Sequence, residues 1–130
     1  MSIILTESLL NAINRLDEAL QLPADDIVRD AVVKRFEFTF EISFKLLTRA
    51  LREFYNKDSE ETYLNVLKQA FSVGIIQDQE VWKQAKKARN YTAHNYSMQA
   101  ADANYALAPH FLREARFLLA KLDEFNQENV

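Results

Sequence analysis

The chain has 130 residues, of which 48% are hydrophobic and 27% are charged, and its formal net charge is −3. This length supports one hydrophobic core, and the composition excludes a disordered chain and a polycation. One glycine and two prolines leave little material for hairpins, and the lack of cysteine excludes disulfides and thiolate metal sites. We therefore expect a single all-α domain over residues 1–130, in a reducing, cytoplasmic compartment.

The N-terminal sequence MSIILTESLLNAINRL has neither a basic region nor a small-residue cleavage site. No apolar run in the chain approaches the length that spans a bilayer. We therefore expect no signal peptide, no transmembrane helix and no membrane partner.

Two helices are predicted in the first half of the chain. The first runs from about Thr6 to Gln21 and ends at Leu22-Pro23, because the residue before proline is pushed out of the α region. Its apolar residues recur at helical spacing: Leu9, Ile13, Leu16 and Leu20. Asp25 or Asp26 is expected to cap the second helix, which continues to about Tyr55.

The second helix is apolar on two sides. One stripe comprises Phe36, Phe40, Phe44, Leu47, Leu51 and Phe54, and the other comprises Phe38, Ile42 and Leu46. A helix with two apolar sides packs on both, so we expect the second side to face a partner subunit in a homodimer. Glu37 and Glu41, four residues apart between the stripes, are either paired catalytic carboxylates or part of a charge ladder with Lys34 and Lys45. We prefer the ladder.

Three further helices complete the prediction. Asp58-Ser59-Glu60-Glu61 is typical of a capping box that starts a third helix, and Gly74 suits the left-handed residue at its end. Asp78 can cap a fourth helix, and Ser97 can cap a last helix that Pro109 should kink. Helices joined by such short links indicate an up-and-down bundle of four or five helices.

The fourth helix leads into the sequence KKARNYTAHNYS at residues 86–97, which contains Arg89-x4-His94. Alone, this spacing is a weak signal. Arg89 could simply offset the dipole at a helix C-terminus, with His94 an incidental loop residue. On a continuous helix, residues five apart point about 140° away from each other. We therefore expect the chain to unwind over residues 90–92, where Asn-Tyr-Thr favours helix weakly, so that the two side chains converge.

Every charged residue between positions 83 and 97 is basic. Cations favour helix C-termini, which explains these charges but not the tyrosines beside them, and aromatic rings can stack on bases. We therefore predict an RNA-binding patch of Lys83, Lys86, Lys87 and Tyr91.

The side chains of the motif suit phosphodiester chemistry. A neutral imidazole can take the proton of a ribose 2′-OH, and a guanidinium can bind phosphorane oxygens through two parallel hydrogen bonds. This chemistry needs no metal, and His94 and His110 are far apart in sequence with no carboxylate-rich loop beside them. We predict no metal site and no cofactor, and we expect His110 to be structural or exposed.

Three blocks of sequence follow one another: RFEFTFEISFKLL at 35–47, LKQAFSVGIIQDQEVW at 67–82 and RNYTAHNY at 89–96. Over roughly residues 27–125 they resemble the HepT-like HEPN family, whose members were long labelled nucleotidyltransferase substrate-binding proteins. The resemblance implies a metal-independent ribonuclease site at a homodimer interface, formed by Arg89, Asn90 and His94. It also implies that Tyr96 is adenylylated by a partner minimal nucleotidyltransferase, which acts as antitoxin.

Three functions remain open. The first is a toxin of a toxin–antitoxin pair, a helical homodimer that cleaves RNA. The second is a non-catalytic subunit that presents a nucleotide or other substrate to a separate nucleotidyltransferase. A helical adaptor with a relic motif is a third. The basic patch and the intact Arg-Asn-x3-His-x-Tyr pattern favour the first.

Overall fold

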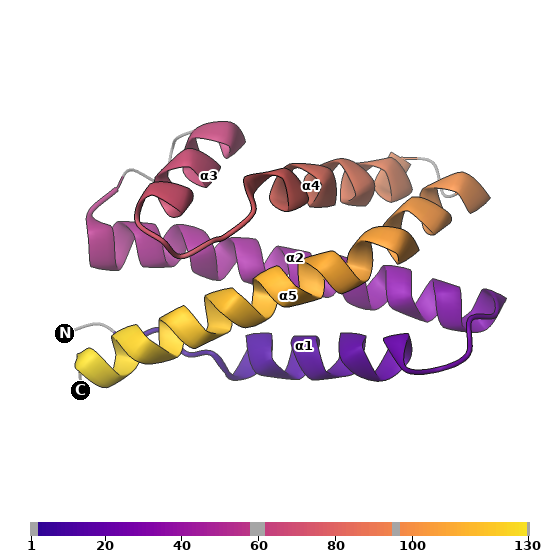
Figure 1. The fold of residues 1–130 in the computed structure, drawn as a ribbon, viewed down its shortest axis with the longest axis horizontal. Helices are drawn as coiled ribbons and strands as arrows, with labels where there is room; N and C mark the ends of the chain where they lie inside the picture. The colour runs from indigo at the N-terminus through magenta and orange to yellow at the C-terminus, as the bar shows by residue number, and fades with distance from the viewer. Residues whose placement is uncertain (1–2, 58–61, 95–96, 130) are drawn as a thin grey trace.

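The computed structural model describes residues 3–57, 62–94 and 97–129, with the backbone alone at residues 93 and 94. These residues form five helices and no strand: α1 (Glu7–Leu20), α2 (Asp26–Tyr55), α3 (Tyr63–Ser72), α4 (Gln79–His94) and α5 (Met98–Glu128). The long helices α2 and α5 pack against each other and against α1, and the two termini lie at the same end (Figure 1). The all-α bundle predicted from the sequence is confirmed.

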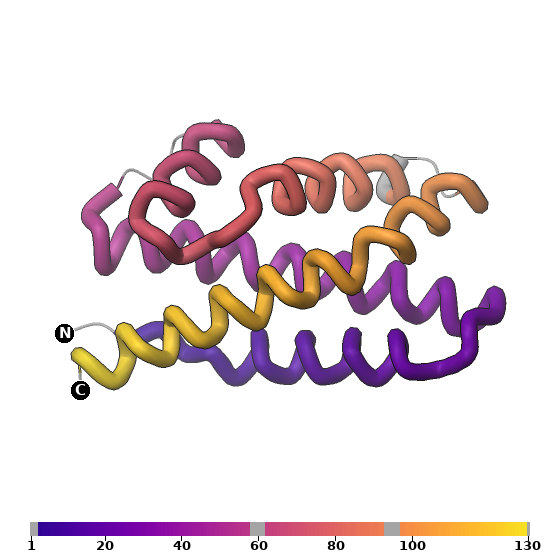
Figure 2. Tube along the Cα trace, viewed as in Figure 1, coloured from indigo at the N-terminus to yellow at the C-terminus, as the bar shows by residue number. Residues whose placement is uncertain are grey.

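The short helix α3 and the motif-bearing helix α4 lie on the other side of α2 from α1, and the chain loops directly from one to the other (Figure 2). Both contact α2, and α4 also packs along α5. One face of α2 is therefore opposite α4, which is where the candidate site forms.

An aromatic cluster fixes α4 against α2 and α5. Trp82, Phe36 and Phe111 are fully buried, and Trp82 meets the edge of Phe111 with ring centroids 4.9 Å apart. Phe40 lies 5.6 Å from Phe111 and 6.3 Å from Trp82. Such aromatic pairs add to the free energy of burial through their edge-to-face geometry. The cluster therefore sets the spacing between α2 and α4.

The helix boundaries follow the predicted caps. The Asp25 carboxylate accepts a hydrogen bond from the backbone N–H of Val28 at 2.8 Å, so Asp25 rather than Asp26 caps α2. Ser97 caps α5 in the same way, and Gly74 has a left-handed φ of 84°. The helix α2 ends at Tyr55, as predicted, and the next residue, Asn56, is left-handed with a φ of 53°.

The start of α3 differs from the predicted one. The capping box at residues 58–61 lies outside the described residues, and the Thr62 hydroxyl caps α3 by accepting from the N–H of Asn65. In the last helix, Pro109 is an interior residue of α5, and the helix continues through it. No helix in the described ranges is long and apolar enough to cross a membrane.

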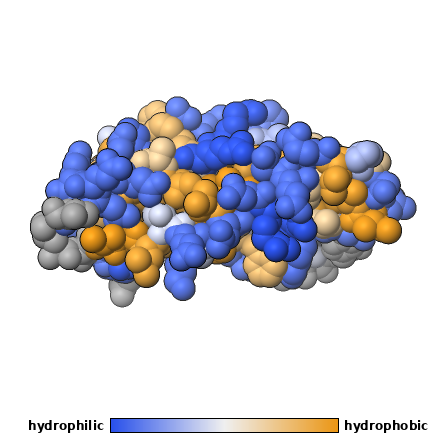
Figure 3. Space-filling view, turned by 90° about the horizontal axis from the view of Figure 1, so that it is seen from below, coloured by the Kyte–Doolittle hydropathy of each residue, from blue (hydrophilic) through white to orange (hydrophobic). Residues whose placement is uncertain are grey.

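The second apolar side of α2 is mostly covered within the chain. Leu46 is buried and Ile42 is partly buried, so Phe38, at 52% exposure, is the most open residue of that stripe. On the face seen from below, hydrophobic patches alternate with hydrophilic ones (Figure 3). The chain's own core therefore covers Ile42 and Leu46, whereas Phe38 stays exposed, and a partner subunit on this side of α2 stays a prediction.

A buried glutamate holds the segment between α3 and α4. One carboxylate oxygen of Glu114, on α5, accepts from the backbone N–H groups of Gln77 and Asp78 and from the indole N–H of Trp82, at 3.0–3.2 Å. Asp78 in turn accepts from the N–H groups of Glu80 and Val81, which confirms it as the cap of α4. Glu114 thereby fixes the start of α4.

Candidate functional site

The helix α4 remains helical to His94, so the predicted unwinding over residues 90–92 is wrong. Thr92 is buried, and its hydroxyl donates to backbone carbonyls inside the helix, including that of Arg89 at 3.0 Å. Asn104, fully buried on α5, donates to the carbonyl of Ala88 at 3.0 Å. These tertiary contacts override the weak helix propensity of the segment.

The continuity of α4 has a geometric consequence for the motif. Positions five apart on one helix lie about 140° apart around its axis, so positions 89 and 94 are on different faces of α4. The side chain of His94 is outside the described part, as is all of Tyr96. Of the motif, the structure describes the side chains of Arg89 and its neighbour Asn90.

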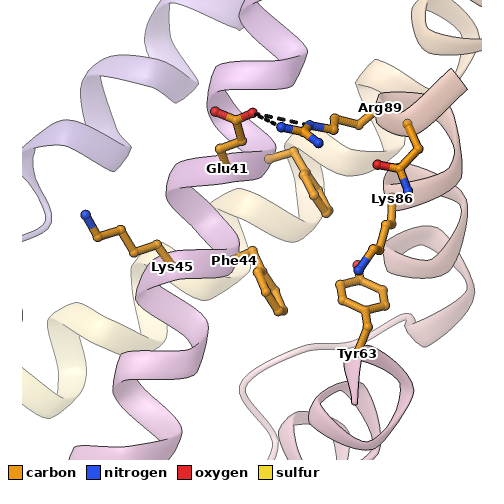
Figure 4. A pocket seen from close by; sticks show the side chains of 8 residues that line it. Glu41, Phe44, Lys45, Tyr63, Lys86 and Arg89 are labelled. Atoms are coloured by element: carbon orange, nitrogen blue, oxygen red, sulfur yellow. Dashed lines mark hydrogen bonds and ion pairs between the residues drawn. The ribbon is translucent and has the colours of Figure 1, made fainter. Parts of the chain in front are cut away.

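Arg89 forms an ion pair with Glu41 across the gap between α4 and α2. Its Nη2 lies 2.6 Å from Glu41 Oε1, and its Nε donates to the same oxygen at 3.2 Å (Figure 4). Both side chains are partly exposed, so the pair contributes at most about 1 kcal/mol to folding. Its main effect is to fix the direction of the guanidinium. Of five N–H donors, three remain for a ligand.

Glu41 was considered as one of two paired carboxylates, but its partner Arg89 was not predicted. The preferred charge-ladder interpretation is wrong for this residue, because its carboxylate reaches across to α4 instead of pairing along α2. Glu41 and Arg89 are 48 positions apart in the sequence, and helical spacing predicts no pairing over that separation.

A cavity of about 270 Å³ opens between α2, α3 and α4 beside this ion pair. We call it the aromatic hollow, and its lining residues are Phe40, Glu41, Phe44, Lys45, Tyr63, Lys86, Arg89 and Asn90. Three cations and one carboxylate lie around three aromatic rings. Ligand pockets of this type combine apolar walls with a few placed polar groups.

The aromatic wall of the hollow is held rigidly. The rings of Phe44 and Tyr63 lie 5.1 Å apart, one from α2 and one from α3. The Tyr63 hydroxyl donates to the carbonyl of Trp82 at 2.7 Å, and burial raises the pKa of this phenol above its ordinary value. The ammonium group of Lys86 lies 4.4 Å from the centre of the Tyr63 ring, a cation–π contact. Tyr63 is therefore a neutral, fixed platform.

The predicted basic patch continues from this hollow. A neighbouring hollow of about 300 Å³ is lined by Lys83, Lys86 and Lys87, and it shares Tyr63, Lys86 and Asn90 with the aromatic hollow. Tyr91 lies apart from Arg89, 42% exposed, in a third hollow between α4 and α5 that also contains Lys87. Lys86 and Asn90 thus lie beside Arg89, Lys83 and Lys87 line the neighbouring hollow, and Tyr91 lies apart from both.

The remaining candidate groups lie elsewhere. His110 is exposed on α5, where its Nδ1 contacts a guanidinium nitrogen of Arg113, as expected for a histidine outside the site. Among the described residues, no three His, Cys, Asp or Glu side chains form a group that could hold a metal ion.

The fold and the site define a small helical bundle with a cationic, aromatic-lined hollow beside an Arg-x4-His motif. In a comparison with known protein families, the family described as "Nucleotidyltransferase substrate binding protein like" matches residues 6–124 of this chain. The chain belongs to this family, which confirms the resemblance predicted from the three sequence blocks.

The relatives carry two kinds of name. A Haemophilus influenzae protein named "Probable ribonuclease HepT" is 34% identical over 117 residues, covering 88% of this chain and 80% of its own length. Two solved structures have TM-scores of 0.78 and 28% identity and cover 88% of this chain. One is a Thermus thermophilus protein, matched over 98% of its length. The other, from Haemophilus influenzae and matched over 96%, is described as a substrate binding domain of a nucleotidyltransferase.

Proposed function

We propose that the protein is a metal-independent endoribonuclease, the toxin of a toxin–antitoxin pair. The observation that carries the proposal is the Arg89 guanidinium, held by Glu41 at the edge of a hollow that is rich in cations and aromatic rings. Lysines next to aromatic rings suit an RNA strand, which offers phosphates and unpaired bases together. The name of the Haemophilus influenzae relative supports the same activity.

The reaction follows from the groups of the motif. His94 takes the proton of a ribose 2′-OH, whose oxygen attacks the adjacent phosphorus. The bond from phosphorus to the 5′ oxygen breaks, and the leaving oxygen receives a proton from the imidazolium or from water. Arg89 stabilises the phosphorane through its free N–H groups, and Asn90 positions the phosphate. The products are a 2′,3′-cyclic phosphate and a 5′-hydroxyl.

The continuity of α4 favours a site shared between two copies of the chain. Positions 89 and 94 lie about 140° apart around the axis of α4, so the proposed site requires that groups from different faces of this helix meet at one phosphate. A homodimer that pairs Arg89 of one copy with His94 of the other meets this requirement. Such a site would be absent from a monomer.

We predict that two inactive variants restore each other. Arg89→Lys should lose most activity, since an ammonium cannot form the two parallel hydrogen bonds of a guanidinium, and His94→Ala loses the base. After denaturation and refolding of an equal mixture, half the dimers contain one copy of each variant, and each such dimer has one intact composite site. Cleavage should therefore return to roughly a quarter of the wild-type rate.

The matched control is each variant denatured and refolded alone, which should stay inactive. If the mixture also stays inactive while dimers form by sedimentation, each site lies within one chain. A stable monomer at micromolar concentration would contradict the homodimer itself.

We further propose that a cognate minimal nucleotidyltransferase silences the toxin by adenylylating Tyr96. The modified tyrosine lies two residues beyond His94 and directly before Ser97, the cap of α5. An added AMP brings negative charge and bulk to the end of α4, where the basic residues gather. Charge neutralisation and steric blocking both oppose RNA binding.

Tyr96→Phe is expected to keep ribonuclease activity and toxicity but to escape silencing, since the ring remains and the acceptor hydroxyl is gone. After co-expression with the nucleotidyltransferase, intact mass should show added adenylate on wild type and none on this variant. Tyr91→Phe, at a surface tyrosine of α4 five positions earlier in the chain, is the matched control and should still be modified. Adenylate that remains on Tyr96→Phe would place the modification elsewhere.

A second candidate function is a non-catalytic subunit that presents a nucleotide or other substrate to the nucleotidyltransferase. The family description and the description of the Haemophilus influenzae structure favour it. The two functions differ in one observable. Wild-type protein that binds nucleotide, cleaves no RNA and is harmless without its partner would support the subunit and reject the toxin.

A further inference from the structure

We propose that the aromatic hollow is a base-binding subsite, which accepts one unpaired RNA base next to the phosphate held at Arg89. The inference rests on the proposed ribonuclease function and specifies how the substrate is held there. The hollow lies directly beside Arg89 and Asn90, so a base bound in it belongs to a nucleotide flanking that phosphate.

The walls of the hollow suit a flat aromatic ligand. Phe44 and Tyr63 project into the same space from α2 and α3, with ring centroids 5.1 Å apart (Figure 4). Phe40 lies behind Phe44 with its ring plane within 3° of parallel and only 6% exposed, so Phe44 is supported from within the core. The bond from the Tyr63 hydroxyl to Trp82 fixes the second ring. A preorganised platform of this type loses little entropy when a base stacks on it.

The charge around the hollow identifies the rest of the ligand. Lys45, Lys86 and Arg89 surround the rings, and a single carboxylate, Glu41, is already paired with Arg89. The neighbouring hollow adds Lys83 and Lys87, and shares Lys86 with the first. Cations that continue from one hollow to the next complement successive phosphates of one strand. The occupant is therefore single-stranded RNA, because a base within a duplex cannot reach such a cavity.

The size of the hollow agrees with this occupant. At about 270 Å³ it is near the lower limit for small-molecule sites, which suits one base and excludes a helix from a partner protein. Every base can stack on an aromatic ring. We therefore expect removal of the base to weaken binding more than exchange of one base for another.

The test is binding of a fluorescently labelled single-stranded RNA, made uncleavable by 2′-O-methyl groups and carrying one abasic position that is moved along the strand. Fluorescence anisotropy gives the Kd. For wild type, one position should raise the Kd about 5- to 150-fold when its base is missing, the range expected for one base stacked on an aromatic residue. In Phe44→Leu this penalty should largely disappear, since the ring that the base stacks on is gone.

The matched control is Phe38→Leu, which removes an exposed ring of α2 that lies outside the hollow. This variant should bind intact and abasic RNA as wild type does. Tyr63→Phe keeps the second ring but loses the hydroxyl that fixes it, so its abasic penalty should lie between those of wild type and Phe44→Leu. Circular dichroism confirms that each variant is folded.

The outcomes separate the subsite from the ribonuclease. An abasic scan that leaves the wild-type Kd within twofold at every position, or a penalty that persists in Phe44→Leu, overturns the subsite while leaving the ribonuclease standing. Failure of wild type to cleave the same RNA without 2′-O-methyl groups rejects the ribonuclease. If the abasic penalty is still seen in that case, the hollow binds bases and the protein is the non-catalytic subunit.

Discussion

His94→Ala should abolish RNA cleavage while leaving RNA binding nearly unchanged. The imidazole is the one group of the motif that can take the 2′-OH proton near neutral pH, and a positioned general base contributes roughly 10²- to 10⁴-fold to a rate. The groups proposed to bind phosphate, Arg89, Lys86 and Lys87, are untouched by the change. Single-turnover cleavage of a labelled RNA should therefore fall by about that factor, with a Kd within about twofold of wild type.

The other histidine of the chain is the matched control for this experiment. His110 lies on the exposed face of α5 beside Arg113, away from the aromatic hollow. His110→Ala should cleave RNA at the wild-type rate. If His94→Ala kept its activity, the proposed base would be wrong and another group would have to accept the proton.

Glu114→Leu should produce the largest loss of stability among single changes outside the site. The new side chain has similar size but no acceptor, so the N–H groups of Gln77, Asp78 and Trp82 lose their shared oxygen. The indole N–H is buried and would have no partner. The two backbone N–H groups are only partly buried, so hydrogen bonds to water would replace part of what they lose. We expect the free energy of unfolding to fall by about 2–4 kcal/mol, measured by urea denaturation.

Two changes control for this result. Glu114→Gln keeps an acceptor oxygen at nearly the same position, so it should lose distinctly less than Glu114→Leu. Glu124→Leu, on an exposed turn of the same helix, should change stability by no more than about 0.5 kcal/mol. Equal losses for Glu114→Leu and Glu114→Gln would show that the three hydrogen bonds do not carry the effect.

Local signals in the sequence predicted the helices because each boundary depends on residues close to it. Asp25, Asp78 and Ser97 cap helices with their own side chains, and Gly74 takes the left-handed conformation that other residues avoid. Apolar spacing likewise predicted the buried side of α1 and the main buried stripe of α2. These effects act over a few residues, which is the range that a pattern in one sequence can report.

The site depends on contacts between distant residues, and there the sequence was less informative. Unwinding of α4 was predicted from weak local propensity, but Asn104 supports the helix from α5, 16 residues away from Ala88. The pairing of Glu41 with Arg89 and the approach of Tyr63 to Phe44 depend on how α3 and α4 dock on α2. The cluster of basic residues is visible in the sequence, but the distribution of these residues among three hollows required the structure.

The most direct test of the ribonuclease proposal is to incubate purified wild-type protein with single-stranded RNA in excess EDTA and to analyse the new ends. The mechanism predicts continued cleavage, with 2′,3′-cyclic phosphate or 3′-phosphate on one product and a 5′-hydroxyl on the other, and no cleavage by His94→Ala under the same conditions. Cleavage that stops on chelation, or products that carry a 5′-phosphate, would contradict it.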